Sequence, residues 1–137
     1  MADRNVELAR RAYEARAAED VDRFLEEFVH PDVEWLTPPL SPAPGPFRGH
    51  DQVRKMIDGY FESFDFFRPE PERILPAASA DQVVALVITR TRGKGSGAEV
   101  DIRVAHLLTI QDDKVIGFQV FMDRREALIA AGLDPDA

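Results

Sequence analysis

The hydrophobic period of this chain changes near residue 70. Before that point, apolar residues recur at three- and four-residue spacing, which is typical of helices that bury one face. From about residue 70 to 122, apolar runs are separated by turn residues, which is typical of an antiparallel meander. Helices followed by a run of strands predict an α+β fold with the helices gathered on one face of the sheet.

Three helices are predicted before the sheet. The first spans residues 3 to 18, and the second begins at a cap, Asp20, and ends before Pro31. The third follows Gly49. Its apolar residues are Val53, Met56, Ile57, Tyr60, Phe61 and Phe64. Residues 32 to 37 predict a short strand, and the proline-rich loop after it is expected to border a binding site.

Four strands are predicted in the second half of the chain. They lie near residues 73 to 77, 82 to 92, 98 to 111 and 114 to 122, and a short helix follows at 124 to 131. Two of them are apolar at nearly every position, so both faces of the sheet should be covered. The helices cover one face, and the other predicts a homodimer. A length of 137 residues fits a single domain over 1–137.

Composition excludes several classes of function. The chain has 25 acidic and 17 basic residues with no charged block, which disfavours a nucleic-acid or membrane partner. It has no cysteine, no histidine pair at metal spacing, and no glycine-rich loop between a strand and a helix, so neither a metal nor another cofactor is predicted. No apolar leader or long apolar segment is evident, and a cytoplasmic location is expected.

Several short motifs, in a fixed order, carry a family resemblance. They are Ala17-Ala18-Glu19-Asp20, Pro31-Asp32-Val33-Glu34-Trp35, Phe47-Arg48-Gly49-His50, Asp113-Lys114-Val115-Ile116 and Phe121-Met122-Asp123. With the order of elements, they resemble the SnoaL-like domains of the NTF2-like superfamily, which includes polyketide cyclases, ketosteroid isomerases and limonene epoxide hydrolases. The resemblance implies an NTF2-like, cystatin-like cone, in which a curved sheet and about three helices enclose an apolar pocket for a hydrophobic small molecule.

The catalytic sets of two relatives are absent by this resemblance. The epoxide hydrolase Asp-Arg-Asp positions hold Thr89, Val87 and Val120. The isomerase oxyanion positions hold Ala105 and Ala12, with Tyr13 one residue away, and the isomerase base would fall at or near Trp35. The resemblance therefore implies a pocket more directly than a reaction.

Turn lengths predict which residues face that pocket. A two-residue turn at Asp112-Asp113 pairs Leu107 with Phe118 and Ala105 with Val120. It also pairs Ile110 with Val115 and Arg103 with Met122. A five-residue loop at 93–97 pairs Thr89 with Asp101 and Val87 with Arg103. The predicted ligand-binding residues are Tyr13, Trp35, Thr37, Thr89, Phe118 and Val120. A slip of one residue would reverse these assignments.

Each candidate catalytic residue also has a structural interpretation. Asp101 and Arg103 form either a buried acid held by an arginine or a salt bridge at the rim of the sheet. His106 is predicted to face away from the pocket, but a β-bulge would bring it inside as the best general base. Asp123 is either an acid/base group or the N-cap of the last helix. Trp35 either stacks on a planar ligand or packs in the core.

Two functions remain open from the sequence. The first is an isomerase-like or cyclase-like acid/base enzyme acting on a hydrophobic carbonyl compound, through Asp101 with Arg103, or less favourably His106 with Asp123. The second is a homodimeric module that binds a small molecule without catalysis.

Overall fold

A computed structural model describes residues 2–39, 41 and 43–136. In chain order, the elements are α1 (Ala2–Ala17), α2 (Val21–Phe28), β1 (Val29–Leu36), β2 (Phe47–Arg48), α3 (Gly49–Ser63), β3 (Phe64–Pro76), β4 (Gln82–Gly93), β5 (Glu99–Gln111), β6 (Lys114–Phe121) and α4 (Arg124–Ala130). The strands form one sheet in the order β2-β1-β6-β5-β4-β3, and β1 and β6 are its parallel pair. The predicted α+β class, with a curved and mainly antiparallel sheet, is confirmed.

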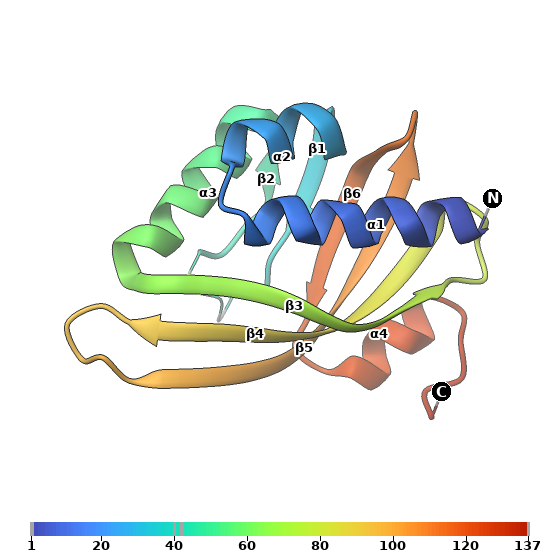
Figure 1. Ribbon diagram of the computed structural model, residues 1–137. Helices are drawn as coiled ribbons and strands as arrows, with labels where there is room; N and C mark the ends of the chain where they lie inside the picture. Colours follow the sequence, from blue (N-terminus) through green and yellow to red (C-terminus); the bar gives the residue numbers. More distant parts are fainter. Residues whose placement is uncertain (1, 40, 42, 137) are drawn as a thin grey trace.

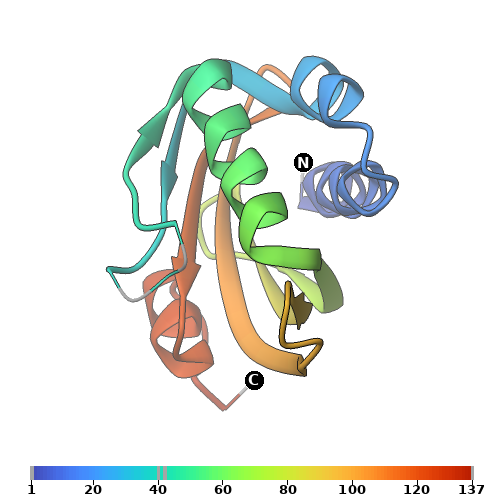
Figure 2. The same ribbon diagram turned by 90° about the vertical axis from the view of Figure 1, so that its left-hand side faces the viewer.

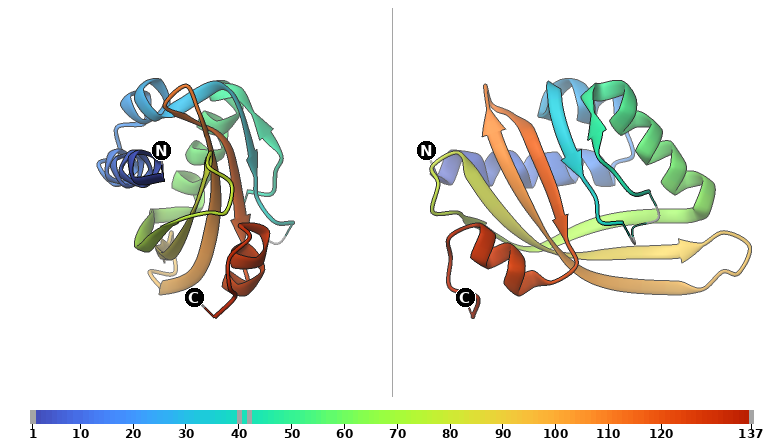
Figure 3. Two further views of the ribbon diagram at one scale, coloured as in Figure 1. Left: turned by 90° about the vertical axis from the view of Figure 1, so that its right-hand side faces the viewer. Right: turned by 180° about the vertical axis from the view of Figure 1, so that it is seen from behind.

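The sheet separates two layers of helices (Figures 1 and 2). Helices α1 and α3 lie over its concave face, and α4 lies on the opposite side of the sheet from α1 (Figure 3). The main core fills the concave side, where buried residues of α1, α2 and α3 meet inward residues of β1, β4, β5 and β6. None of the helices in the described ranges has the length and apolarity needed to cross a bilayer.

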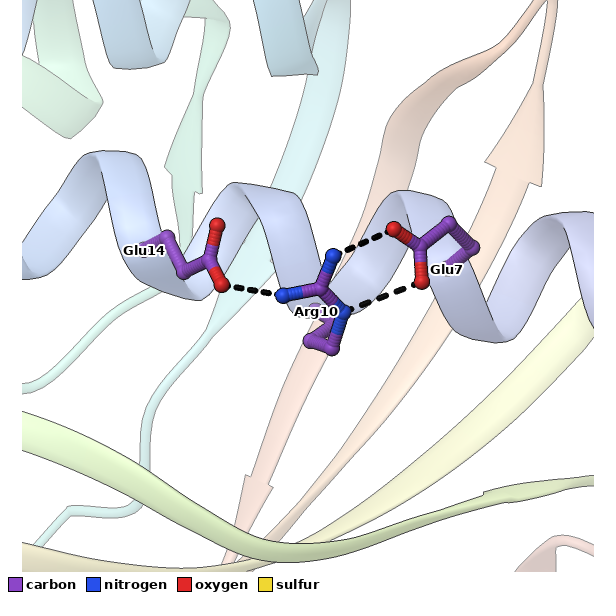
Figure 4. A network of polar contacts seen from close by, with 3 residues as sticks. All are labelled: Glu7, Arg10 and Glu14. Atoms are coloured by element: carbon purple, nitrogen blue, oxygen red, sulfur yellow. Dashed lines mark hydrogen bonds and ion pairs between the residues drawn. The ribbon is translucent and has the colours of Figure 1, made fainter.

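Helix α1 has one ionic face and one buried face. On the outside, Arg10 bonds Glu7 and Glu14, three and four residues away, in the spacing that brings side chains together on a helix (Figure 4). On the inside, Ala9, Tyr13 and Arg16 are buried. These three follow the i, i+4, i+7 spacing of a single helical stripe. The buried stripe of α1 thus contains an arginine.

Several boundaries differ from the sequence prediction. Helix α2 ends at Phe28 and β1 begins at Val29, three residues earlier than expected, while the Asp20 cap is confirmed. Strand β3 begins at Phe64, which was predicted to belong to the preceding helix. It extends through Pro69 and Pro71 because it is an edge strand, where a missing N–H on the free side costs no ladder bond.

The β5–β6 pairing contains a bulge that the sequence prediction missed. Ile110 pairs with Val115 as expected, but the register then shifts, and Leu108 rather than Leu107 pairs with Phe118. His106 pairs with Val120, so the expected pairing of Ala105 with Val120 is wrong. Ile116 is the extra residue on β6, and the small Gly117 follows it against Thr109.

The β4–β5 hairpin is also offset by one residue from the prediction. Gly93 pairs back to Ala98 through its backbone N–H, so the loop has four residues rather than five. Thr89 therefore pairs with Ile102, and Val87 pairs with Val104. Asp101 pairs with Arg90 on the convex face, and Arg103 pairs with Ile88 on the same face.

Helix α4 covers part of the convex face. Ala127, Leu128 and Ala131 pack on Val84 and Leu86 in a second buried cluster. Val84 and Leu86, on the convex face of β4, are therefore covered within one chain. The expected homodimer would use the part of the convex face that α4 leaves open, and it stays a prediction.

Candidate functional site

A cavity of about 260 Å³ lies between the concave face of the sheet and the helices. This volume is near the lower end of the ~300–1,000 Å³ typical of small-molecule sites. Apolar side chains from all layers make most of its wall, including Phe24, Met56, Val104 and Leu108. Met122 lines the cavity and is 53% exposed, which places it at the mouth. Pro38 and Ser41 also line it, so the proline-rich loop borders the cavity, and its role in binding stays a prediction. Leu40 and Pro42 of that loop lie outside the described residues.

All six side chains predicted to bind a ligand line this cavity. They are Tyr13, Trp35, Thr37, Thr89, Phe118 and Val120. Trp35 also belongs to the core, because it stacks on Phe118 at a centroid distance of 3.8 Å and meets Phe24 edge-on. The core interpretation of Trp35 is therefore confirmed, and the packed ring also forms part of the wall, while stacking on a planar ligand stays a prediction.

His106 faces the cavity, contrary to the sequence prediction. The bulge at Ile116 and the four-residue hairpin loop place it on the same face as Ile102, Val104 and Leu108. Its side chain is buried, and Nδ1 lies 2.6 Å from the Tyr13 hydroxyl oxygen. The Phe118 ring lies against the imidazole at a centroid distance of 4.5 Å. An apolar wall thus holds one pair of hydrogen-bonded polar groups.

The protons of this pair follow from burial. Burial lowers the pKa of His106 to about 3 and raises the pKa of Tyr13 well above 10, so both side chains are neutral at pH 7. Both groups are able to donate across this contact. Nδ1 is the acceptor available to the Tyr13 hydroxyl among the described residues, so we take the hydroxyl as the donor. We therefore assign the imidazole proton to Nε2. No fully enclosed side-chain nitrogen among these residues lacks a partner, so Nε2–H reaches the cavity as a donor.

Arg16 is the cation of the cavity wall, and the sequence analysis missed it. Its side chain is 9% exposed and lines the cavity from the last turn of α1. Among the described residues, no carboxylate forms an ion pair with it, and Glu19, three residues further along the chain, is the partner of Arg68. Burial lowers the pKa of Arg16, and weaker attraction by Tyr60 and Glu19 opposes this. The sequence did contain a signal for Arg16. It lies three residues after Tyr13 on the same helix, and residues at this spacing share one face.

The position of Arg16 is energetically unfavourable without a ligand. A cation at a helix C-terminus gains about 0.3–1 kcal/mol from the helix dipole. Removing a charge from water costs several kcal/mol when no partner compensates it. The helix dipole alone therefore does not explain a buried arginine here.

Hydrogen-bond donors dominate the polar part of the wall. It contains Tyr13, Arg16, Thr37, Ser41, Tyr60, Thr89 and His106. Thr37 already donates to the Ala43 carbonyl, and Thr89 is buried. No aspartate or glutamate occurs among the described lining residues. The wall is therefore suited to a ligand that presents oxygen acceptors, and it offers no carboxylate for proton abstraction.

Asp101 and Arg103 lie outside the cavity, so the prediction that they face it is wrong. Both are exposed on the convex face, because the hairpin loop is one residue shorter than expected. Asp101 accepts a 2.8 Å hydrogen bond from Arg90, not from Arg103. The salt-bridge interpretation of Asp101 thus fits the structure, with a different partner.

Asp123 caps the last helix. Its carboxylate accepts a 2.9 Å hydrogen bond from the backbone N–H of Arg125, in the first turn of α4. The side chain is exposed and does not line the cavity. This geometry satisfies a helix N–H group and supports the capping interpretation.

Solved structures with the same architecture establish the fold. An NTF2-like protein of unknown function from Burkholderia pseudomallei aligns with a TM-score of 0.77 and 24% identity, over 92% of this chain and 95% of that one. TerC, co-crystallised with polyporic acid, aligns with a TM-score of 0.76 and 20% identity, over 98% and 99%. A Mycobacterium tuberculosis protein in complex with estradiol-17β-hemisuccinate aligns with a TM-score of 0.70 and 12% identity, over 85% and 92%.

These likenesses define an NTF2-like fold, as the sequence resemblance implied. The sequence is also matched over residues 9–118 by the family model of the SnoaL-like domain. The chain therefore belongs to the SnoaL-like family. No protein with a curated description matches it.

Proposed function

We propose that this protein binds a small hydrophobic carbonyl compound in the cavity, and that the carbonyl oxygen accepts a hydrogen bond from His106 Nε2–H. The pair of Tyr13 and His106 is the observation that carries this proposal. It places a neutral donor on a mostly apolar wall. A donor in a mostly apolar pocket gives orientation, while the apolar part of the wall gives affinity.

Ligands of structurally similar proteins support a binding role. TerC has been co-crystallised with polyporic acid, and the M. tuberculosis protein is in complex with estradiol-17β-hemisuccinate. Both are small organic molecules. The proposed ligand belongs to the same broad class.

An acid/base enzyme of the isomerase or cyclase type is the second candidate. His106 Nε2–H would stabilise the oxygen of an enolate, because a neutral donor in a water-poor site is already oriented toward the developing charge. A histidine with a pKa of about 3 is a weak base at neutral pH, and the described wall has no carboxylate to replace it. Binding without catalysis is therefore our first proposal.

We also propose a homodimer through the part of the convex face that α4 leaves open. Thr109 and Gln119 lie there and are half-buried within one chain. Gly117 on β6 pairs with Thr109 and has no side chain, so nothing projects from the sheet at this position. A flat strip of small and uncharged residues suits a sheet-to-sheet contact.

A cytoplasmic location stays a prediction from the sequence.

A matched pair of compounds tests the binding proposal. Benzophenone and diphenylmethane have the same two rings, and only benzophenone has a carbonyl oxygen. We expect benzophenone to raise the melting temperature and to bind more tightly than diphenylmethane, by about tenfold for one good hydrogen bond. In His106→Phe, the ratio of the affinities for benzophenone and diphenylmethane should fall to about one. General effects of the substitution on folding change both affinities alike and cancel in this ratio. If neither compound binds to the wild type, the cavity is closed to ligands of this kind and the proposal is wrong.

A further inference from the structure

The Arg16 side chain gives the cavity a feature that a site for neutral molecules does not need. An apolar pocket for a neutral carbonyl compound is complete with the aromatic wall and His106. Arg16 adds a guanidinium group that is nine-tenths buried and lines the same cavity. Such a group is costly to keep without a partner.

The described surroundings of Arg16 give its guanidinium group no ion-pair partner, and Glu19 acts on it only as a weak, more distant charge. Among the described residues, neither the ion pairs nor the side-chain hydrogen bonds include its guanidinium group, and Glu19 is engaged with Arg68 at 3.9 Å. The Tyr60 hydroxyl also acts electrostatically on Arg16. Burial raises the pKa of Tyr60, so this hydroxyl stays neutral at pH 7 and provides no negative charge. The contrast with Arg10 on the same helix is direct, because Arg10 has two carboxylate partners on the outer face (Figure 4).

The guanidinium nitrogens also reach open volume. No fully enclosed nitrogen among the described side chains lacks a hydrogen-bond partner, so the guanidinium nitrogens of Arg16 that have no described partner keep some accessible surface. Arg16 is only 9% exposed and lines the cavity, so the cavity is where a ligand meets this side chain. Five N–H donors in a planar group match the two oxygens of a carboxylate.

We propose that Arg16 selects an anionic ligand, a hydrophobic carboxylate whose charged group pairs with the guanidinium while its apolar body occupies the aromatic part of the cavity. This inference rests on the proposed function and narrows it from carbonyl compounds in general to those that also carry an acid. The pair forms in a partly dry site, where a charge-assisted hydrogen bond is stronger than on the surface.

The test uses 4-benzoylbenzoate and 4-benzoylbenzamide, measured by isothermal titration calorimetry at pH 7. Both keep the ketone for His106 and have nearly the same shape, and only the benzoate is charged. We expect the wild type to bind the benzoate at least about tenfold more tightly than the amide. Arg16→Met should reduce this ratio to about one and leave the affinity for the amide within about threefold. Arg16→Lys should retain part of the preference, because it keeps the charge but loses the planar fork.

Arg10→Met is the matched control, since it removes an exposed arginine from the same helix and should keep the full preference. Equal binding of the two compounds by the wild type overturns the role of Arg16 and leaves the proposed function standing. A preference that persists in Arg16→Met also overturns it. Failure of both compounds to bind the wild type contradicts the proposed function itself, and the inference with it. The wild-type comparison depends on no variant, so a variant that fails to fold does not remove the test.

Discussion

Tyr13 and His106 set each other's hydrogen-bonding role. A hydroxyl group can donate or accept, and a neutral imidazole can present either nitrogen as the donor. Burial keeps both groups neutral, and with the hydroxyl assigned as the donor across the 2.6 Å contact, the ring proton is on Nε2. The chemical character of the cavity therefore depends on a pair of residues that are 93 positions apart in the chain.

The low pKa of His106 predicts a pH dependence of stability. In the folded protein the imidazole stays neutral down to about pH 3, whereas in the unfolded chain it takes up a proton below about pH 6.5. Between these values the unfolded state binds more protons, so stability falls as the pH is lowered. The loss reaches about 1.4 kcal/mol per pH unit from this group alone.

Urea unfolding of the wild type and His106→Gln at several pH values from 7 to 4.5 measures this contribution. Glutamine keeps a hydrogen-bonding group near Tyr13 but does not titrate. The free energy of unfolding should decrease with acid more steeply in the wild type than in the variant. Parallel curves would show that His106 is solvated and would contradict the assignment of its protons.

Arg16 predicts a conflict between stability and binding. In the ligand-free protein its buried charge is uncompensated, so replacing it with an apolar side chain of similar length should stabilise the fold. We expect Arg16→Met to raise the free energy of unfolding by about 1 kcal/mol, equivalent to a melting temperature higher by roughly 3 °C. Differential scanning calorimetry without ligand measures this. Arg10→Met is the control, and it should instead lower the free energy of unfolding by a few tenths of a kcal/mol per lost surface pair. If Arg16→Met has a lower melting temperature than the wild type, the fold itself needs this arginine.

At the scale of elements, the sequence predicts the strands better than their register. Strands β4, β5 and β6 lie within one residue of the predicted limits, because long apolar runs between turn residues are a strong signal. The pairing was wrong in both hairpins by one residue, and in a sheet one residue exchanges the two faces. These two shifts of one residue placed His106 in the cavity and Asp101 outside it.

The signals for the missed features differ in strength. Gly117 inside a strand indicates a bulge, and its position after Ile116 could have suggested the shift. The four-residue loop at 94–97 has no such marker, because glycines are compatible with several loop lengths. Trp35 and Thr37 were assigned correctly to the wall, since alternation along β1 needs no pairing partner.

Asp123 provides a test at the scale of one helix. If its carboxylate only caps α4, Asp123→Ala should lower the free energy of unfolding by about 1 kcal/mol. The affinity for 4-benzoylbenzoate should not change, because the side chain lies outside the cavity. Asp20→Ala, which removes the matching cap of α2, should cost a similar amount. A selective loss of binding in Asp123→Ala would instead revive the acid/base interpretation.

Across the whole molecule, surface and cavity differ in charge. The chain carries a net charge of −8, while the described lining of the cavity has one arginine and no carboxylate. A negative surface repels an approaching anion. At 0.1 M salt this repulsion is largely screened at distances beyond about 10 Å. Selection of an anion must therefore arise from the local pairing at Arg16, and not from long-range attraction.

The two faces of the sheet also separate binding from assembly. The cavity lies on the concave side, and the proposed dimer contact uses the strip of the convex side that α4 does not cover. If both proposals hold, a substitution on the convex strip changes the mass in solution and leaves the ligand affinity unchanged. Gln119 suits this test, because it pairs with Leu107 on the convex face and does not line the cavity.

Light scattering after size-exclusion chromatography should give about twice the chain mass of 15.4 kDa for the wild type. Gln119→Arg should give the monomer mass, because a two-fold interface contains each substituted residue twice, so two new charges are buried. Val100→Arg adds a charge at an exposed residue far along the β4–β5 hairpin and should leave the dimer intact. A wild type that stays at 15.4 kDa would show that α4 alone is sufficient to cover the convex face. In that case the uncovered strip is ordinary solvated surface, and the cavity must be formed by one chain.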